Sequence, residues 1–159
     1  MSPSELILRV AIWPAVAFGL AATRGWRPAT SWRVGALFYA VHVAAAFHHA
    51  YRWSHSAAVA DNVRQVRETL GIEFGAGIWV NYAFSLGWML AALTWPKLGP
   101  VARRVWIAVF LFIAFQGTVV FAHGHGRWIG LALFLAAAVH AWRFRGEWVE
   151  GLKGEGLKG

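Results

Sequence analysis

Five apolar segments dominate this 159-residue chain, and most of the basic residues lie in the gaps between them and in the C-terminal tail. A hydrocarbon core of about 30 Å needs about 20 helical residues to cross it. Helices are favoured in that environment because they pair their own backbone polar groups. The segments cover residues 5–22, 32–51, 72–95, 103–122 and 128–142. We therefore predict an all-α integral membrane protein with five transmembrane helices.

The composition supports the same class of protein. Hydrophobic residues make up 58% of the chain, with 11 Trp, which is more than a soluble domain of this length usually carries. The formal net charge is +8, but the basic residues sit in the gaps and form no run, so we expect no nucleic-acid partner. The expected partners are the lipid bilayer and either a second membrane protein or further copies of this chain. The absence of Cys excludes disulfides, thiolate ligands and Cys nucleophiles.

The distribution of Lys and Arg predicts the orientation. In the five-helix arrangement ten of them lie on the side of the C-terminus and five on the opposite side. Because basic residues accumulate on the cytoplasmic side, we place the N-terminus outside and the C-terminus in the cytoplasm. In a bacterium this membrane would be the inner one. A single transmembrane domain over residues 1–145 then precedes a flexible cytoplasmic tail over 146–159, which ends in the low-complexity sequence GLKGEGLKG.

A surface helix is predicted in the long connection between the second and third segments. Over residues 56–70 apolar side chains recur at helical spacing on one face, while charged side chains occupy the other. Ser56 is the expected N-cap and Gly71 the expected C-terminal stop. Such a helix lies in the membrane interface. We expect it to cover the outer end of the bundle as a lid.

Histidines gather at that outer end. Five of the seven are expected there, at the end of the second segment, at the start of the lid and in the turn HGHGR: His48, His49, His55, His123 and His125. His42 lies seven residues before His49, which is two turns of an α-helix, so the two should share one face. Intramembrane ionisable groups are costly and tend to mark sites. We predict that these six histidines form a common site.

Polar residues on neighbouring segments are expected to support that site. Glu73 and Asn81 occupy one strip of the third segment, and Gln116 lies two helical turns before His123 on the fourth. Asp61 belongs to the lid. These four residues would orient the imidazoles as hydrogen-bond partners.

The chemistry predicted for the cluster is transition-metal binding. Neutral imidazoles beside carboxylates are ligands for Zn, Cu or Fe. No two of the histidines stand at the i, i+3 or i, i+4 spacing of a single-helix metal motif, so the ion would be held between elements. The ion would serve catalysis, metal handling or structure, and the sequence identifies neither a reaction nor catalytic residues.

Two alternatives use the same residues differently. His42 and His140 are expected at similar depth on different helices, where they could be the axial ligands of a b-type haem in an electron-transfer protein. Alternatively the protein holds no cofactor and is an accessory subunit, or a proton-coupled channel or transporter in which His titrates near neutral pH. Taken singly, Asn81, Gln116 and His140 are also typical of hydrogen bonds between helices.

Overall fold

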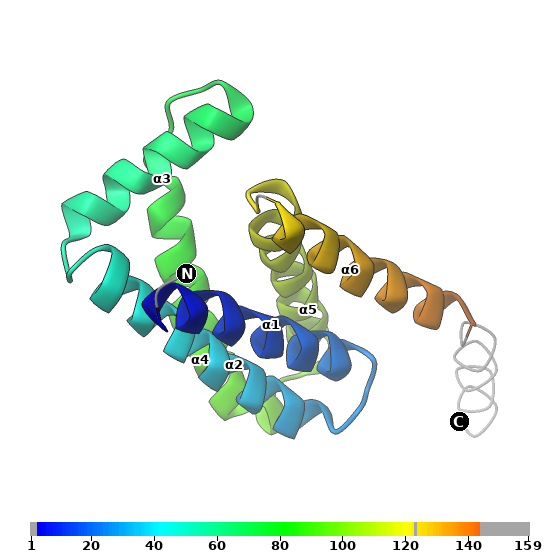
Figure 1. Cartoon of the computed structure of the whole chain (residues 1–159). Coiled ribbons are helices and arrows are strands. Elements are labelled where there is room, and N and C mark those ends of the chain that lie inside the picture. Colours follow the sequence, from blue (N-terminus) through cyan, green and yellow to red (C-terminus); the bar gives the residue numbers. More distant parts are fainter. Residues whose placement is uncertain (1–2, 123, 144–159) are drawn as a thin grey trace, which may run out of the picture.

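The computed structural model describes residues 3–122 and 124–143, with the side chains of residues 10–122 and 124–139. All regular structure in these ranges is helical, and six α-helices account for most of it (Figure 1). In chain order the elements are α1 (Pro3–Thr23), α2 (Pro28–Ala45), the π-helical turn η1 (Ala46–Ala50), α3 (His55–Leu70), α4 (Gly77–Thr94), the 3₁₀ turn η2 (Trp95–Lys97), α5 (Pro100–Phe115), the π-helical turn η3 (Gln116–Val120) and α6 (His125–Arg143).

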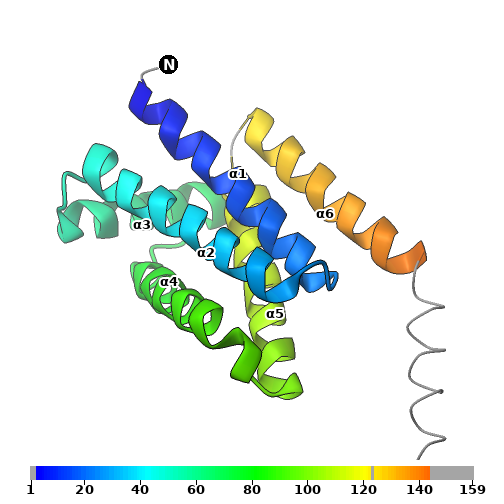
Figure 2. The same ribbon diagram turned by 90° about the horizontal axis from the view of Figure 1, so that it is seen from below.

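An aromatic cluster around Trp32 forms the core. Helices α1 and α2 pack along each other in both views (Figure 1 and Figure 2), and α4 and α5 close over them. The Trp32 side chain is fully buried, and its ring centroid lies 5.6 Å from that of Trp88, 4.7 Å from Trp95 and 5.4 Å from Phe110. Rings at these separations and tilts add attraction beyond the burial of their surface. The cluster therefore joins α2, α4, η2 and α5 at one end of the molecule.

The predicted surface helix is present as α3, with one correction at its start. Ser54, not Ser56, is its N-cap, and its side chain accepts a hydrogen bond of 3.2 Å from the amide of Ala57. Gly71 ends the helix as predicted, with a φ of 73° that an L side chain rarely adopts.

The start of the third predicted segment is wrong. The helix α4 begins at Gly77 rather than at residue 72, and residues 72–76 form a connection without helical structure. The backbone at Gly75 passes close to α3, where an added Cβ would lie 3.2 Å from Val63. Gly75 thus allows this connection to pass close to α3, and the stretch does not form the first turn of a helix.

Only part of the five-span prediction is supported by helix length and composition. Among the described residues one helical stretch, Pro100–Val120, is long and apolar enough to cross a membrane. The apolar parts of the first and last helices, Val10–Thr23 and His125–Val139, are shorter. The helix α4 has 18 residues and carries Asn81, Tyr82 and Ser85. The all-helical fold is confirmed, but the five transmembrane helices are not.

Close packing of α6 against η3 depends on Gly130. A Cβ at this position would lie 2.4 Å from the backbone oxygen of Thr118, which cannot move aside as a flexible side chain could. We expect Gly130→Ala to lower the free energy of unfolding by about 1–3 kcal/mol, as overpacking usually does. Gly117→Ala is the matched control, because nothing lies within 4 Å of its added Cβ. Thermal unfolding in mild detergent measures both, and equal stability of the two variants would contradict this packing.

Candidate functional site

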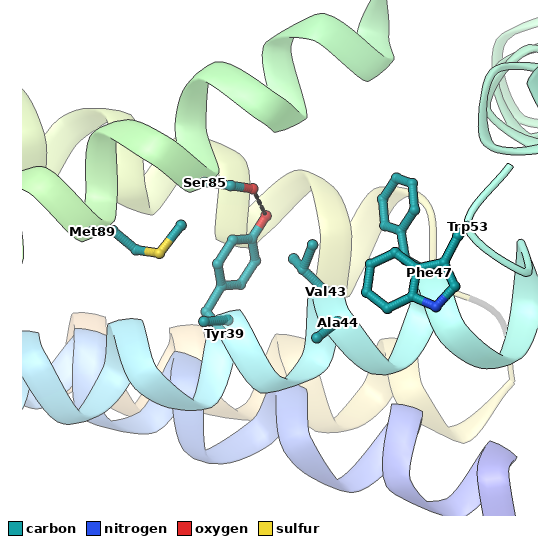
Figure 3. Close-up of a pocket in the computed structure, with 8 residues that line it drawn as sticks. Tyr39, Val43, Ala44, Phe47, Trp53, Ser85 and Met89 are labelled. Carbon is teal, nitrogen blue, oxygen red and sulfur yellow. Dashed lines mark hydrogen bonds between the residues drawn. The ribbon is translucent and has the colours of Figure 1, made fainter. Parts of the chain in front are cut away.

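An apolar cavity lies between α2 and α4. Its volume is about 220 Å³ and it is open on one side. Carbon atoms form nearly all of its wall, and the hydroxyl groups of Tyr39 and Ser85, two of the lining residues, approach each other (Figure 3). The lining residues come from α2 and η1, from the turn before α3 and from α4: Tyr39, Ala40, Val43, Ala44, Phe47, Trp53, Ser85 and Met89.

The divergence of two helices creates this cavity. Near the start of α2 the helices are held together, since Arg33 donates a hydrogen bond of 3.2 Å from Nε to the carbonyl of Ala92 and Trp32 packs on Trp88. Toward the end of α2 the two ribbons separate (Figure 1 and Figure 3). Tyr39, Val43 and Phe47 recur at a spacing of four residues, which places them along one face of α2.

The helix α3 lies across the end at which α2 and α4 have separated. At the α2 side, the Tyr51 hydroxyl donates a hydrogen bond of 2.9 Å to the carboxylate of Asp61. At the α4 side, Nδ1 of His55 lies 2.9 Å from the hydroxyl of Tyr82. The helices α2, α3 and α4 therefore outline three sides of a triangle (Figure 1).

The surroundings of Asp61 and Tyr51 favour the ionised carboxylate and the neutral phenol, the two forms that hydrogen-bond to each other. Burial alone would raise the pKa of Asp61, but hydrogen bonds from Arg64, Tyr51 and Gln65 outweigh it, so this pKa lies below its ordinary value of 3.8. Burial raises the pKa of Tyr51 to about 12, and both the hydrogen bond and the negative charge of Asp61 add to that rise. The contact is thus between a neutral phenol and a carboxylate over most of the pH range.

The predicted histidine ligands are spread over several elements. His48 and His49 are exposed neighbours in η1, with ring centroids 4.6 Å apart. His55 is exposed at the start of α3, and besides Tyr82 its ring lies near Trp79, with centroids 5.3 Å apart. His125 is exposed at the start of α6. His123 and the side chain of His140 lie outside the described residues.

The prediction that His42 and His49 share one face assumed an uninterrupted α-helix between them, which the structure does not have. His42 is half-buried in α2, where its ring centroid is 6.4 Å from that of Tyr39, whereas His49 is exposed. The π-helical turn η1, with its wider i→i+5 repeat, shifts the α-helical phase between the two residues. Gln116 is the first residue of the π-helical turn η3, and its expected partner, residue 123, lies outside the described residues.

The predicted supporting residues have other contacts. Glu73 precedes α4 instead of lying on it, is 70% exposed and forms an ion pair of 2.9 Å with Arg67. Asn81 is exposed on α4, and its carbonyl accepts a hydrogen bond of 2.7 Å from Ser85. Asp61 binds Tyr51, Gln65 and Arg64. Within the described residues no group of three His, Asp or Glu is placed to hold a metal ion. Metal and haem binding stay predictions.

Sequence reasoning missed the residues that build the cavity and attach α3. Tyr39 and Phe47 belong to the second apolar segment, and no motif marks them or Tyr51 and Tyr82 as functional residues. A signal was present, since Tyr82, Ser85 and Met89 follow one another at three and four residues, and Tyr39 and Phe47 at eight. The chain matches no protein family, no curated protein and no solved structure.

The contact between Tyr51 and Asp61 should make the attachment of α3 depend on pH. A lowered pKa of Asp61 contributes stability that is present above its ordinary value and is lost as the pH falls through the folded value. The raised pKa of Tyr51 contributes stability that is complete below its ordinary value of 10.0 and is lost as the pH rises toward about 12. We therefore expect α3 to be held firmly at neutral pH and to loosen at both extremes.

Spin labels on Cys at the exposed positions Ala50 and Ala60 measure this loosening as a broader distance distribution. Tyr51→Phe should abolish the alkaline change, because no phenol remains to ionise. Asp61→Asn should abolish the acid change. In the parent protein, a distribution that stays constant both on full protonation of Asp61 and up to pH 12 would contradict the proposed attachment.

Proposed function

We propose that this chain is a polytopic membrane protein that binds an apolar, membrane-resident molecule in the cavity between α2 and α4. The cavity itself, walled by carbon and open to the side, carries this proposal. Five membrane crossings, with α3 in the outer interface, are part of it. Separate observations support the membrane environment and the binding of a ligand.

Exposed apolar side chains support a membrane environment. In the most apolar window of Pro100–Val120 only 17% of the residues are buried, whereas the core helix of a soluble protein would be mostly buried. Large apolar residues also stay exposed on α4 and α6, among them Leu86, Leu90, Leu93, Leu135 and Val139. Continuous surfaces of this kind are unfavourable in water and typical of contact with lipid or with a partner.

The size and the opening of the cavity support a ligand that is only partly enclosed. Sites that surround a whole drug-sized ligand usually measure about 300–1,000 Å³, which exceeds the volume found here. The remainder of the ligand would lie outside the opening of the cavity. There it would meet exposed apolar side chains one helical turn from the lining residues, namely Leu37 and Val41 on α2 and Leu86 on α4. A lipid-like molecule suits these surroundings, since its exposed part would stay in the bilayer.

The proposed orientation can be tested with single Cys variants in intact cells. Cys at Ala60 on the exposed face of α3 should react with a membrane-impermeant thiol reagent, whereas Cys at Lys97 should react only after permeabilisation. Ala58→Cys is the matched control on α3, because Ala58 is fully buried and should stay unreactive in both states. The reverse pattern for Ala60 and Lys97 would place α3 in the cytoplasm and overturn the proposed orientation.

The ligand proposal is tested by photolabelling in phospholipid nanodiscs with a diazirine-bearing alkane. Trypsin cuts after Arg33 and Arg52, so one peptide, residues 34–52, contains the cavity wall from Tyr39 to Phe47. We expect this peptide to be labelled, and an excess of unlabelled alkane to abolish most of that labelling. Labelling of a plain lipid-facing surface would not saturate in this way.

A pair of Val variants provides the control. Val43→Trp fills the cavity and should reduce labelling of the peptide to background. Val109→Trp places the same bulk on the exposed side of α5 and should leave the labelling unchanged. Saturable labelling that survives Val43→Trp would contradict binding in this cavity.

A further inference from the structure

Among the described residues, the hydrogen of the Tyr39 hydroxyl has no acceptor at normal hydrogen-bond distance. A serine hydroxyl has one hydrogen, and that of Ser85 is donated to the carbonyl of Asn81 at 2.7 Å. Ser85 is also the donor in a longer contact with the Tyr39 hydroxyl, at 3.4 Å between oxygens, whereas the usual O–H···O distance is about 2.5–3.0 Å. Because the Tyr39 oxygen is the acceptor in that contact, the phenolic hydrogen itself is not used by Ser85. Tyr39 is therefore poised to donate to another oxygen inside the cavity (Figure 3).

The position of Tyr39 along its helix restricts which acceptor oxygen of a ligand can reach its hydroxyl. Tyr39 lies eleven residues after Pro28 and eleven before Ala50, the first and last residues of α2 and η1. Each distance corresponds to about 16 Å of helix, close to half of a hydrocarbon core of about 30 Å. If α2 spans the membrane, Tyr39 lies near its midplane. The ester oxygens of phospholipids lie at the boundary of the core and would not reach it.

We propose that Tyr39 selects the ligand by hydrogen bonding, and that the ligand is an uncharged, largely hydrocarbon molecule whose carbonyl or similar acceptor oxygen reaches the middle of the bilayer. Isoprenoid quinones and long-chain ketones have this chemistry. The inference rests on the proposed function, because it assigns the ligand class of the same cavity. Ser85 fixes no ligand atom in this arrangement, since its hydrogen is already donated.

The test compares two competitors of the photolabel in the same nanodiscs, pentadecan-8-one and pentadecane. They differ by one central oxygen, so hydrocarbon burial is nearly equal. In the parent protein the ketone should compete at a concentration lower by about two- to tenfold, the effect of one neutral hydrogen bond. Tyr39→Phe should abolish this advantage and leave competition by pentadecane unchanged, which also shows that the variant is folded.

Two control variants locate the donor. Ser85→Ala should retain the ketone advantage, because it removes no hydrogen available to the ligand. Tyr82→Phe should retain it too, because that hydroxyl contacts His55 at the end of the divergence and does not line the cavity. An advantage that persists in Tyr39→Phe, or that disappears in Ser85→Ala, would overturn the assignment of Tyr39.

The outcomes separate this inference from the proposed function. If the alkane label never reaches residues 34–52 saturably, the ligand-binding function itself fails. If labelling is saturable but the ketone has no advantage, only the role of Tyr39 fails. Nanodiscs of ether-linked instead of ester-linked phospholipid form a further arm. Labelling that rises in ether lipid, and only when Tyr39 is present, would identify phospholipid esters as the occupant and overturn the proposed ligand class.

Discussion

The packing of Trp32 is the interaction on which the arrangement of the helices depends. Its buried ring contacts Trp88, Trp95 and Phe110, which belong to three later elements. Gly35 lies one turn further along α2, where a Cβ would be 3.1 Å from Trp88 and 3.2 Å from the backbone of Ala15. Large rings beside a glycine bring α1, α2 and α4 close together at this end. Further along, single aromatic pairs still join the two helices, with ring centroids 5.3 Å apart for Tyr39 and Phe84 and 6.0 Å apart for Phe47 and Tyr82, and the cavity lies beside these pairs.

The helix α3 complements this core because it connects the ends that the core does not hold. Its apolar side chains Ala58 and Val66 are buried, while Arg64, Arg67 and Glu68 are exposed. The ion pairs of Arg64 are largely exposed and contribute little stability by themselves. The more specific attachments are the contacts of Tyr51 with Asp61 and of His55 with Tyr82, one on each side of the divergence. Hydrogen bonds at these two points set the position of α3 more than its surface charges do.

The sequence predicted the features that depend on local pattern. The amphipathic period of α3 and the left-handed stop at Gly71 follow from residues within one helix, and both are found in the structure. The start of α4 was missed, because an apolar stretch with glycines does not by itself distinguish a helix from a close crossing. The π-helical turn η1 changes the phase of α2 at Ala46, and the sequence AFHHA has no established signature for it. The cavity depends on the angle between α2 and α4, which results from contacts such as Arg33 with Ala92, 59 residues apart.

A single hydroxyl can have a large effect on selectivity in such a cavity. Removing a polar group from water is unfavourable, and an apolar wall supplies no substitute partner. A ligand that enters from the bilayer has already lost its contact with water, so the cavity need not provide a strong hydrophobic gain. Differences in binding between similar molecules then come mainly from shape and from the one donor inside. The Tyr39 hydroxyl can be this donor. Among the described residues its hydrogen has no acceptor at short distance, and the wall around it is carbon.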